Sequence, residues 1–167
     1  MLPVGLESMP TGPGLASVLA SVNRSRLSAH DLYDYLAARA RQLAYEQAEL
    51  LADLFETALA AHEPADSRHR AADVDEHSAD QIGWALHWAA GYAQSQVLLG
   101  RDLVRRLPMV WQALRAGQID YARAAAFVDC LADLPIEVAR YIATRLLDRA
   151  GRWTVAHEHH SYPLAID

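Results

Sequence analysis

Cysteine and lysine are the residue types that this sequence most clearly lacks: Cys130 is its one cysteine, and all 15 of its basic residues are arginine. A single cysteine excludes a disulfide framework and a cysteine-rich zinc site within the chain. This usage is typical of a reducing compartment, so we predict a cytoplasmic protein. Cys130 lies in a mostly apolar segment, where we expect it to be a small core residue.

Long hydrophobic runs are absent as well. The apolar stretches are far shorter than the roughly 20 residues that cross a bilayer. The N-terminal segment MLPVGLESMPTGPG has neither the basic region nor the apolar region of a secretory signal. We therefore expect a protein that is not exported and has no membrane partner.

Alternating strand patterns are also missing, whereas alanine is the commonest residue, and glycine and proline fall mainly between periodic apolar segments. A chain of 167 residues is long enough for one domain that buries roughly 70% of its unfolded surface. The predicted fold class is all-α. We expect a long N-terminal helix packed on a compact bundle of about five shorter helices, including a helix-turn-helix-like hairpin.

Proline, glycine and charged residues divide the chain into segments. Residues 1–13 are rich in proline and glycine and are expected to be disordered. Residues 14–152 form the predicted helical domain, which is interrupted at 62–77 by a polar segment typical of a mobile loop. Residues 153–167 are expected to be an irregular tail.

A long helix is predicted from residue 28 to about residue 61, because nothing in this segment breaks a helix. Ser28 and Asp31 have the spacing of a capping box at its start. Leu36, Leu43 and Leu50 recur every seven residues and form one apolar stripe. The favoured interpretation is that this stripe faces the core. The alternative is a coiled-coil seam, which would make the protein a homo-oligomer through these three leucines.

The segment LPMVWQALRAGQIDYARAAAF, residues 107–127, predicts two short helices joined by a tight turn. Pro108 fits the first turn of one helix, Gly117 supplies the left-handed residue that ends it, and Asp120 caps the next helix. A last helix is predicted from 135 to 150. The side chains expected to face inward from it are Val138, Ile142 and Leu146.

Residues 78–106 predict another helical pair, with the apolar spacing of a helix-turn-helix. Gly83 is the small residue that such a pair needs where its helices cross, and Ala93 and Val97 are apolar anchors on the second helix. His87 falls at the turn, and histidine tolerates a left-handed conformation better than a β-branched residue does. The same spacing occurs in ordinary helical hairpins, so a purely structural role stays open.

The second helix of this pair, residues 89–106, leads to the candidate DNA-binding residues. Its polar side chains can hydrogen-bond to base edges, and arginines further along can reach phosphates. The candidates are Tyr92, Gln94, Gln96, Arg101, Arg105, Arg106 and Arg115. Residues 78–152 hold 9 arginines and 7 acidic residues, whereas residues 1–77 hold 6 arginines and 12 acidic residues. Because few phosphates could be neutralised, we expect DNA binding to be weak.

Catalytic motifs are not recognisable in the chain. It has no nucleophile elbow, no glycine-rich phosphate loop and no His-Glu-x-x-His pair. The densest set of metal-ligand side chains is HEHH at 157–160, where His157 and His159 would face opposite ways on a helix. We expect a frayed tail there, and predict no enzymatic activity, no cofactor and no metal. A metal nuclease that uses this tail is the least favoured reading.

Four segments of the chain together resemble a known family. They are LYDYLAARARQLAYEQAELLADL, ADQIGWALHWAAGYAQ, LVRRLPMVWQALRAGQIDYARAAAFVDCLADL and RLLDRAGRWT. Their order, from residue 28 to residue 154, resembles domain of unknown function 222, an actinobacterial family that includes the 13E12 repeat proteins. Members commonly continue into a C-terminal His-Asn-His (HNH) endonuclease domain, so the resemblance implies a nucleic-acid context.

This chain departs from the family pattern in two places. After GRWT the family runs on towards the nuclease, whereas this sequence reads VAHEHHSYPLAID and stops. The second helix of the hairpin is often arginine-rich in relatives, whereas here it reads GYAQSQVLLG. The leading hypothesis is a non-catalytic nucleic-acid-binding or targeting module of a mobile-element-associated, HNH-endonuclease-type protein that lacks its nuclease domain. The alternative is a helical protein-interaction or self-association module with no role at DNA.

Overall fold

The structure, a computed structural model, describes residues 2–60 and 76–150. Over these residues the chain is all-α, as predicted, and contains no strand. The helices are α1 (Pro13–Ser21), the 3-10 turn η1 (Arg24–Arg26), α2 (Ala29–Ala60), α3 (Glu76–Leu86), α4 (Ala90–Arg101), the π-helical turn η2 (Asp102–Arg106), α5 (Pro108–Arg115), α6 (Tyr121–Cys130) and α7 (Ile136–Ala150). Most of the predicted loop at 62–77 and the whole predicted tail at 153–167 lie outside the described residues.

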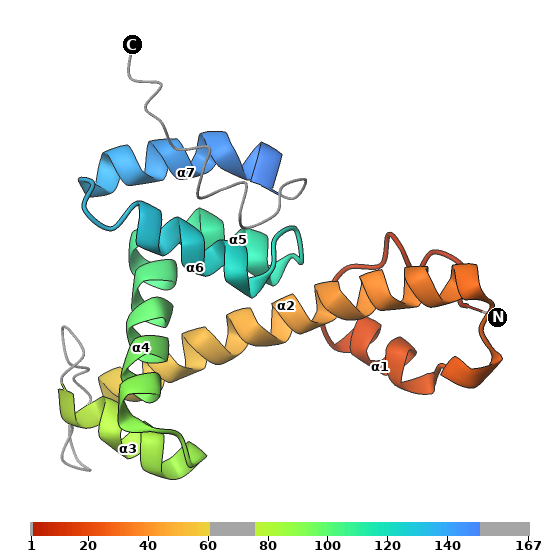
Figure 1. Ribbon diagram of the computed structural model, residues 1–167, viewed down its shortest axis with the longest axis horizontal. Helices are drawn as coiled ribbons and strands as arrows, with labels where there is room; N and C mark the ends of the chain where they lie inside the picture. The colour runs from red at the N-terminus through yellow and green to blue at the C-terminus, as the bar shows by residue number, and fades with distance from the viewer. Residues whose placement is uncertain (1, 61–75, 151–167) are drawn as a thin grey trace.

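Helix α2 is the longest of the described helices. Its 32 residues span roughly 48 Å. The predicted capping box is present at its start: the backbone N–H of Asp31 donates to Ser28 Oγ at 3.1 Å, and the N–H of Ser28 donates to Asp31 Oδ2 at 3.4 Å. In Figure 1, α1 lies beside one end of α2, and the helices α3 to α7 gather around the other end. None of the described helices is both long and apolar enough to cross a membrane.

The larger of two hydrophobic cores lies between the C-terminal half of α2 and the helices α3 to α7. Its most buried large side chains include Leu51, Val97, Leu107, Leu114 and Phe127. Helix α4 crosses α2 closely at Gly100, where a Cβ atom would stand 2.3 Å from the carbonyl oxygen of Leu51. Ala93 and Val97 of α4 are buried, as predicted.

The smaller core holds the N-terminal segment and α1 against the first half of α2. It consists of Leu6, Leu15, Leu19, Tyr35 and Ala38. The prediction that residues 1–13 are disordered is wrong for residues 2–13. Gly5 and Gly12, at φ 82° and 127°, turn this segment back onto α2. There the Arg41 guanidinium donates to the carbonyl oxygens of Leu6 and Met9 at 2.7 and 3.0 Å.

The apolar stripe of α2 does not face either core. Leu36, Leu43 and Leu50 are 62%, 57% and 44% exposed, so the core-facing interpretation is wrong. The larger core takes the face that carries Ala44, Ala48 and Leu51, and the smaller core takes the face that carries Tyr35 and Ala38. Because these faces flank the stripe, packing both of them leaves the leucines in solvent.

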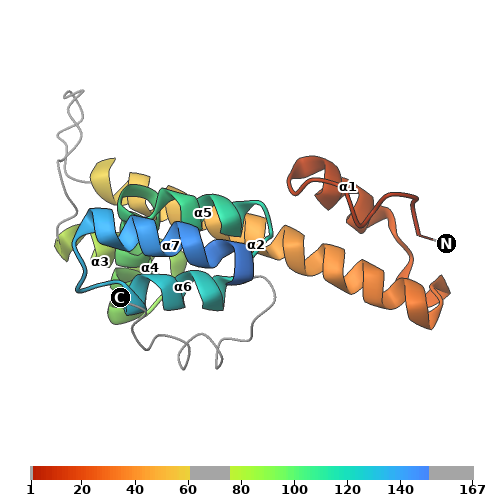
Figure 2. The ribbon, with the colours of Figure 1, turned by 90° about the horizontal axis from the view of Figure 1, so that it is seen from above.

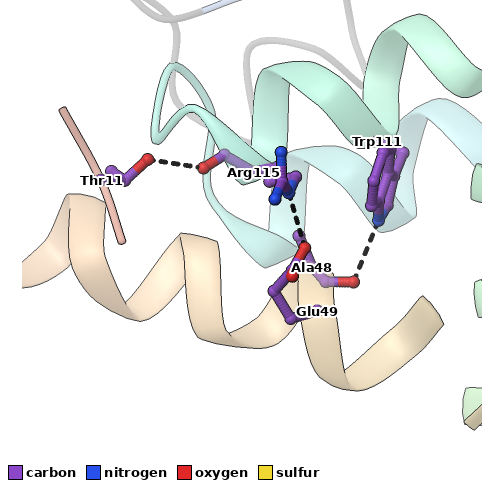
Figure 3. A network of polar contacts seen from close by, with 5 residues as sticks. All are labelled: Thr11, Ala48, Glu49, Trp111 and Arg115. Atoms are coloured by element: carbon purple, nitrogen blue, oxygen red, sulfur yellow. Dashed lines mark hydrogen bonds and ion pairs between the residues drawn. The ribbon is translucent and has the colours of Figure 1, made fainter. Parts of the chain in front are cut away.

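Polar contacts connect the N-terminal segment, α2 and α5 (Figure 3). Thr11 Oγ1 donates to the carbonyl oxygen of Arg115 at 2.8 Å, and Arg115 Nε donates to Glu49 Oε1 at 2.6 Å. Trp111 Nε1 donates to the carbonyl oxygen of Ala48 at 3.0 Å. These bonds hold the C-terminal end of α5 on the middle of α2.

The turn between α5 and α6 follows the prediction. Pro108 is the first residue of α5, and Gly117 is left-handed at φ 68°. The Asp120 side chain caps α6 by accepting from the N–H of Arg123 at 2.9 Å. Cys130, however, is exposed rather than buried. It is the last residue of α6, and the side of the helix that carries Ala124 and Phe127 is the one that packs into the core.

The last helix is rotated relative to its predicted register. Val138 is exposed, whereas Ala139 and Ala143 are buried. These alanines are four residues apart, so they share one face, and their small side chains let α7 approach the core closely. Ile142 and Leu146 pack on the core from the edge of this face, which confirms that part of the prediction.

Candidate nucleic-acid interface

The α3–α4 hairpin has the geometry predicted at its crossing and at its turn. Gly83 packs against α4, where an added Cβ would stand 3.5 Å from Ala93 Cβ and 3.2 Å from the Trp88 carbonyl oxygen. The N–H of Trp88 donates to the carbonyl oxygen of Gly83 at 2.8 Å. His87 is left-handed at φ 56° and, within the described residues, is the one non-glycine residue with positive φ. Three residues, 87–89, therefore turn the chain sharply between two helices in contact.

The outer face of α4 carries part of the predicted base-reading set. Tyr92 and Gln94 of this set are exposed. Ser95, which was not among the candidates, is exposed beside them, and its hydroxyl donates to the carbonyl oxygen of Tyr92 at 2.8 Å. Gln96 does not belong to this face: it is 8% exposed, and its Oε1 accepts from the Tyr121 hydroxyl at 2.8 Å. The prediction for Gln96 is wrong because the residue lies three positions after Ala93, on the side of α4 that packs into the core.

Aromatic side chains surround the turn of the hairpin. The Trp88 and Tyr92 rings meet edge to face, with centroids 4.9 Å apart. Trp84 on α3 is 79% exposed. Sequence reasoning missed Trp84, although its position two residues after the core residue Ile82 could have placed it on the outer face of α3.

Arg101 and Arg105 lie beyond the base-reading face, at the end of α4 and in η2. Arg101 Nε donates to Asp102 Oδ1 at 3.0 Å. The Arg105 guanidinium stacks over the Phe55 ring, with Cζ 4.8 Å from the ring centroid. The Arg105 residue is exposed, and Arg101 is partly exposed.

Arg106 has a structural role. Its guanidinium donates to the carbonyl oxygen of Leu131, at 2.6 Å, and to that of Leu134, after the end of α6. Both residues lie in the turn after α6, where the Leu131 carbonyl oxygen also accepts from the N–H of Leu134 at 3.2 Å. We therefore remove Arg106 from the set of phosphate contacts.

Arg115 is the last residue of α5, and its side chain packs against α2 (Figure 3). It pairs with Glu49, and its guanidinium lies 5.4 and 5.5 Å from the ring centroids of Tyr45 and Trp111. The Glu49 carboxylate, by its hydrogen bond and its charge, raises the pKa of Arg115 above its ordinary value. The structure therefore does not bring Arg115 together with the outer face of α4, and this candidate also leaves the interface.

Comparison with known protein families identifies a match. The family model described as domain of unknown function (DUF222) matches residues 31–163. The chain belongs to the DUF222 family. No curated protein and no solved structure matches it. The matched region begins inside α2, so α1 and its packing partner Leu6 lie before it. At the other end the match extends beyond residue 154, which is where the sequence resemblance is expected to end.

A metal centre finds no support in the described part of the DUF222 domain. No group of three or more His, Cys, Asp or Glu side chains that could hold a metal ion occurs within residues 2–60 and 76–150. The tail histidines, His157, His159 and His160, lie outside the described residues. The candidate interface thus consists of Tyr92, Gln94 and Ser95, with Arg101 and Arg105 at its far end.

Proposed function

We propose that this DUF222 domain is a non-catalytic nucleic-acid-binding module in which α3 and α4 act as a helix-turn-helix. The observation that carries the proposal is the contact of Gly83 with Ala93 across a three-residue turn that contains the left-handed His87. A helix-turn-helix needs a small residue at this crossing and a left-handed residue in its turn. In this reading α4 enters the major groove, and the module targets a protein of the HNH-endonuclease type to DNA in the cytoplasm.

The outer face of α4 has suitable chemistry for reading bases. The Gln94 amide can both donate and accept at a base edge, as adenine requires. The Tyr92 ring and hydroxyl can contact a thymine methyl group or a phosphate oxygen. These groups supply hydrogen bonds but no charge, so affinity has to come from neighbouring cations.

Cations near this face are few. Arg101 and Arg105 are the predicted phosphate contacts that lie nearest to this face, and each neutralised phosphate contributes about one unit to the salt dependence of binding. The net charge of -6 opposes association at long range. We therefore expect weak binding, micromolar or poorer, with little sequence preference.

Titration of a fluorescent duplex with the full chain at about 50 and 200 mM salt tests the proposal, because few phosphate contacts should still give a measurable salt slope. We expect binding at the lower salt that falls several-fold at the higher salt. The Tyr92→Ala, Gln94→Ala double variant should lose this binding. The matched control is Tyr141→Ala, Gln112→Ala, which removes one exposed tyrosine and one exposed glutamine from α7 and α5.

Two results would count against this function. One is the absence of binding by the folded protein at 50 mM salt, and the other is equal binding by the two double variants. Arg106→Ala is not a suitable test variant, since it removes the side-chain hydrogen bonds that join η2 to the carbonyl groups of Leu131 and Leu134 and so weakens the fold.

A second candidate function is a protein-interaction module. The exposure of Leu36, Leu43 and Leu50 favours it, because a regular row of large apolar side chains in solvent is typical of a surface that a protein partner covers.

A further inference from the structure

The exposed leucines of α2 lie on one side of the helix and are here called the leucine stripe. It consists of Leu32, Leu36, Leu43 and Leu50. The stripe runs along roughly 27 Å of helix at 1.5 Å per residue. Figure 2 shows α1 along one side of the N-terminal half of α2 and no described helix along the opposite side. The first half of α2 is therefore open to a partner over most of the length of the stripe.

Two residues of opposite charge border the middle of the stripe on one flank, and the exposed Asp53, three residues after Leu50, continues this flank at the end of the stripe. Arg39 follows Leu36 by three residues, and Glu46 follows Leu43 by three, so both lie on the same side of the leucines. Both side chains are exposed. The other flank carries Ala40 and Gln47, each four residues after a leucine, and is uncharged.

We infer that the leucine stripe is a self-association surface on which the α2 helices of two copies pair antiparallel about a twofold axis at Leu43. Residues 36 and 50 are equally distant from residue 43. Leu43 therefore meets Leu43 of the partner subunit, and Leu36 meets Leu50 of the partner subunit on either side of the axis. Three of the four leucines of the stripe thus meet a leucine of the partner stripe, and this part of the stripe is complementary to itself, as a twofold interface requires.

The charges select the antiparallel arrangement. A twofold axis perpendicular to both helices brings the charged flank of one helix beside the charged flank of the other. Arg39 then lies within one residue of Glu46 of the partner subunit along the axis, and the symmetry repeats this pair. A parallel pair would place the charged flank against the flank of Ala40 and Gln47, where it finds no opposite charge.

The contact is small for a dimer interface. Two helices 8–10 Å apart that touch over roughly 27 Å cover less than the ~800 Å² per partner of a standard stable interface. We therefore expect a reversible dimer with a dissociation constant on the order of micromolar rather than an obligate one. This inference is independent of the nucleic-acid proposal, which uses another surface.

Sedimentation equilibrium of the full chain, from low to several hundred micromolar, tests the dimer. The weight-average mass should rise from 18.4 kDa towards twice that value. Leu43→Glu places two carboxylates at the twofold axis and should keep the protein monomeric over the whole range. The matched control is Leu86→Glu, which charges an exposed leucine on α3, outside the stripe, and should leave dimerisation unchanged. Circular dichroism checks that each variant is folded.

Charge reversal tests the antiparallel register. Arg39→Glu puts carboxylate against carboxylate at both symmetric pairs, and Glu46→Arg puts guanidinium against guanidinium, so each variant alone should dimerise roughly tenfold more weakly. An equimolar mixture of the two variants restores both opposite-charge pairs. The mixture should therefore form a heterodimer with about the affinity of the parent protein, an effect that a loss of folding cannot mimic.

Three results would overturn the inference. The first is a protein that stays monomeric at every concentration. This result would overturn the inference whether the stripe is covered by another part of the chain or left in solvent. The second is dimerisation that survives Leu43→Glu. The third is a mixture of the charge variants that associates no better than either variant alone, since a dimer would then use another register.

Discussion

Arginine side chains hold this fold together through backbone carbonyl groups. Within residues 2–60 and 76–150, three arginines each donate to the carbonyl oxygens of two residues. The sets are Arg41 with Leu6 and Met9, Arg106 with Leu131 and Leu134, and Arg140 with Arg105 and Arg106. A planar guanidinium can bridge two acceptors in a fixed geometry, whereas a lysine ammonium is a point charge on a flexible stem. This use of arginine suits a chain without lysine, and it leaves fewer cations for phosphates.

Gly117 is the residue at which a single methyl group should be least tolerated in the α5–α6 turn. Its φ is 68°, and a Cβ atom would stand 2.7 Å from Arg41 Cβ and 3.0 Å from Arg41 Cα. Gly117→Ala should therefore lower the free energy of unfolding by roughly 2–4 kcal/mol, from left-handed strain and the clash with α2 together. Urea unfolding followed by circular dichroism measures it, with Gln118→Ala, an exposed neighbour, as the control. A midpoint equal to that of the control would show that the turn is not held against α2.

At the scale of the helices, the features that the sequence predicted are those that depend on neighbouring residues. The Ser28–Asp31 box, the Asp120 cap and the left-handed His87 and Gly117 are local, and the structure confirms all four. Caps and turns need particular side chains at fixed positions, so a single sequence is enough to place them.

Which side of each helix faces a core is harder to predict from the sequence, because it depends on which helices pack together. The stripe of α2 has the heptad spacing of a core face, but two cores occupy the faces beside it, which no local pattern of α2 reveals. At the candidate interface, the positions of Tyr92 and Gln94 follow from the amphipathic pattern of α4. The burial of Gln96 depends on the Tyr121 hydroxyl, and the engagement of Arg106 depends on where α6 ends.

Helix α4 contains two glycines that should respond in opposite ways to alanine. At Gly100 the new Cβ would meet the Leu51 carbonyl oxygen at 2.3 Å, so Gly100→Ala should separate α4 from α2 and lower stability by about 3 kcal/mol or more. At Gly91 nothing lies within 4 Å, so Gly91→Ala should raise stability by roughly 0.5–1 kcal/mol through helix propensity. Urea unfolding of both variants gives each value, and equal shifts would argue against the close crossing of α2 and α4.

At the scale of the whole molecule, one helix serves two cores of unequal size. The smaller core has five buried residues from the N-terminal segment, α1 and the first half of α2, whereas the larger one draws on α2 to α7. Hydrogen bonds join them near the middle of α2, where the N–H of Gly12 donates to Gln42 Oε1 at 2.9 Å and Thr11 contacts the end of α5. So small a core cannot hold α1 and the start of α2 together unless the larger core is folded.

The two cores should therefore unfold differently. The smaller core can open locally, whereas loss of the larger core should unfold the whole molecule. Leu15 and Leu114 are both fully buried, in the smaller and the larger core respectively, and each Leu→Ala change should cost about 2–5 kcal/mol within its own core. We expect Leu15→Ala to speed amide hydrogen exchange in α1 and the first three turns of α2, and to leave α4 to α6 as protected as in the parent protein. Leu114→Ala should speed exchange throughout, because the smaller core depends on the larger. Uniform acceleration by Leu15→Ala would show instead that the two cores unfold as one cooperative unit, with the polar contacts around Gln42 and Arg115 strong enough to couple them.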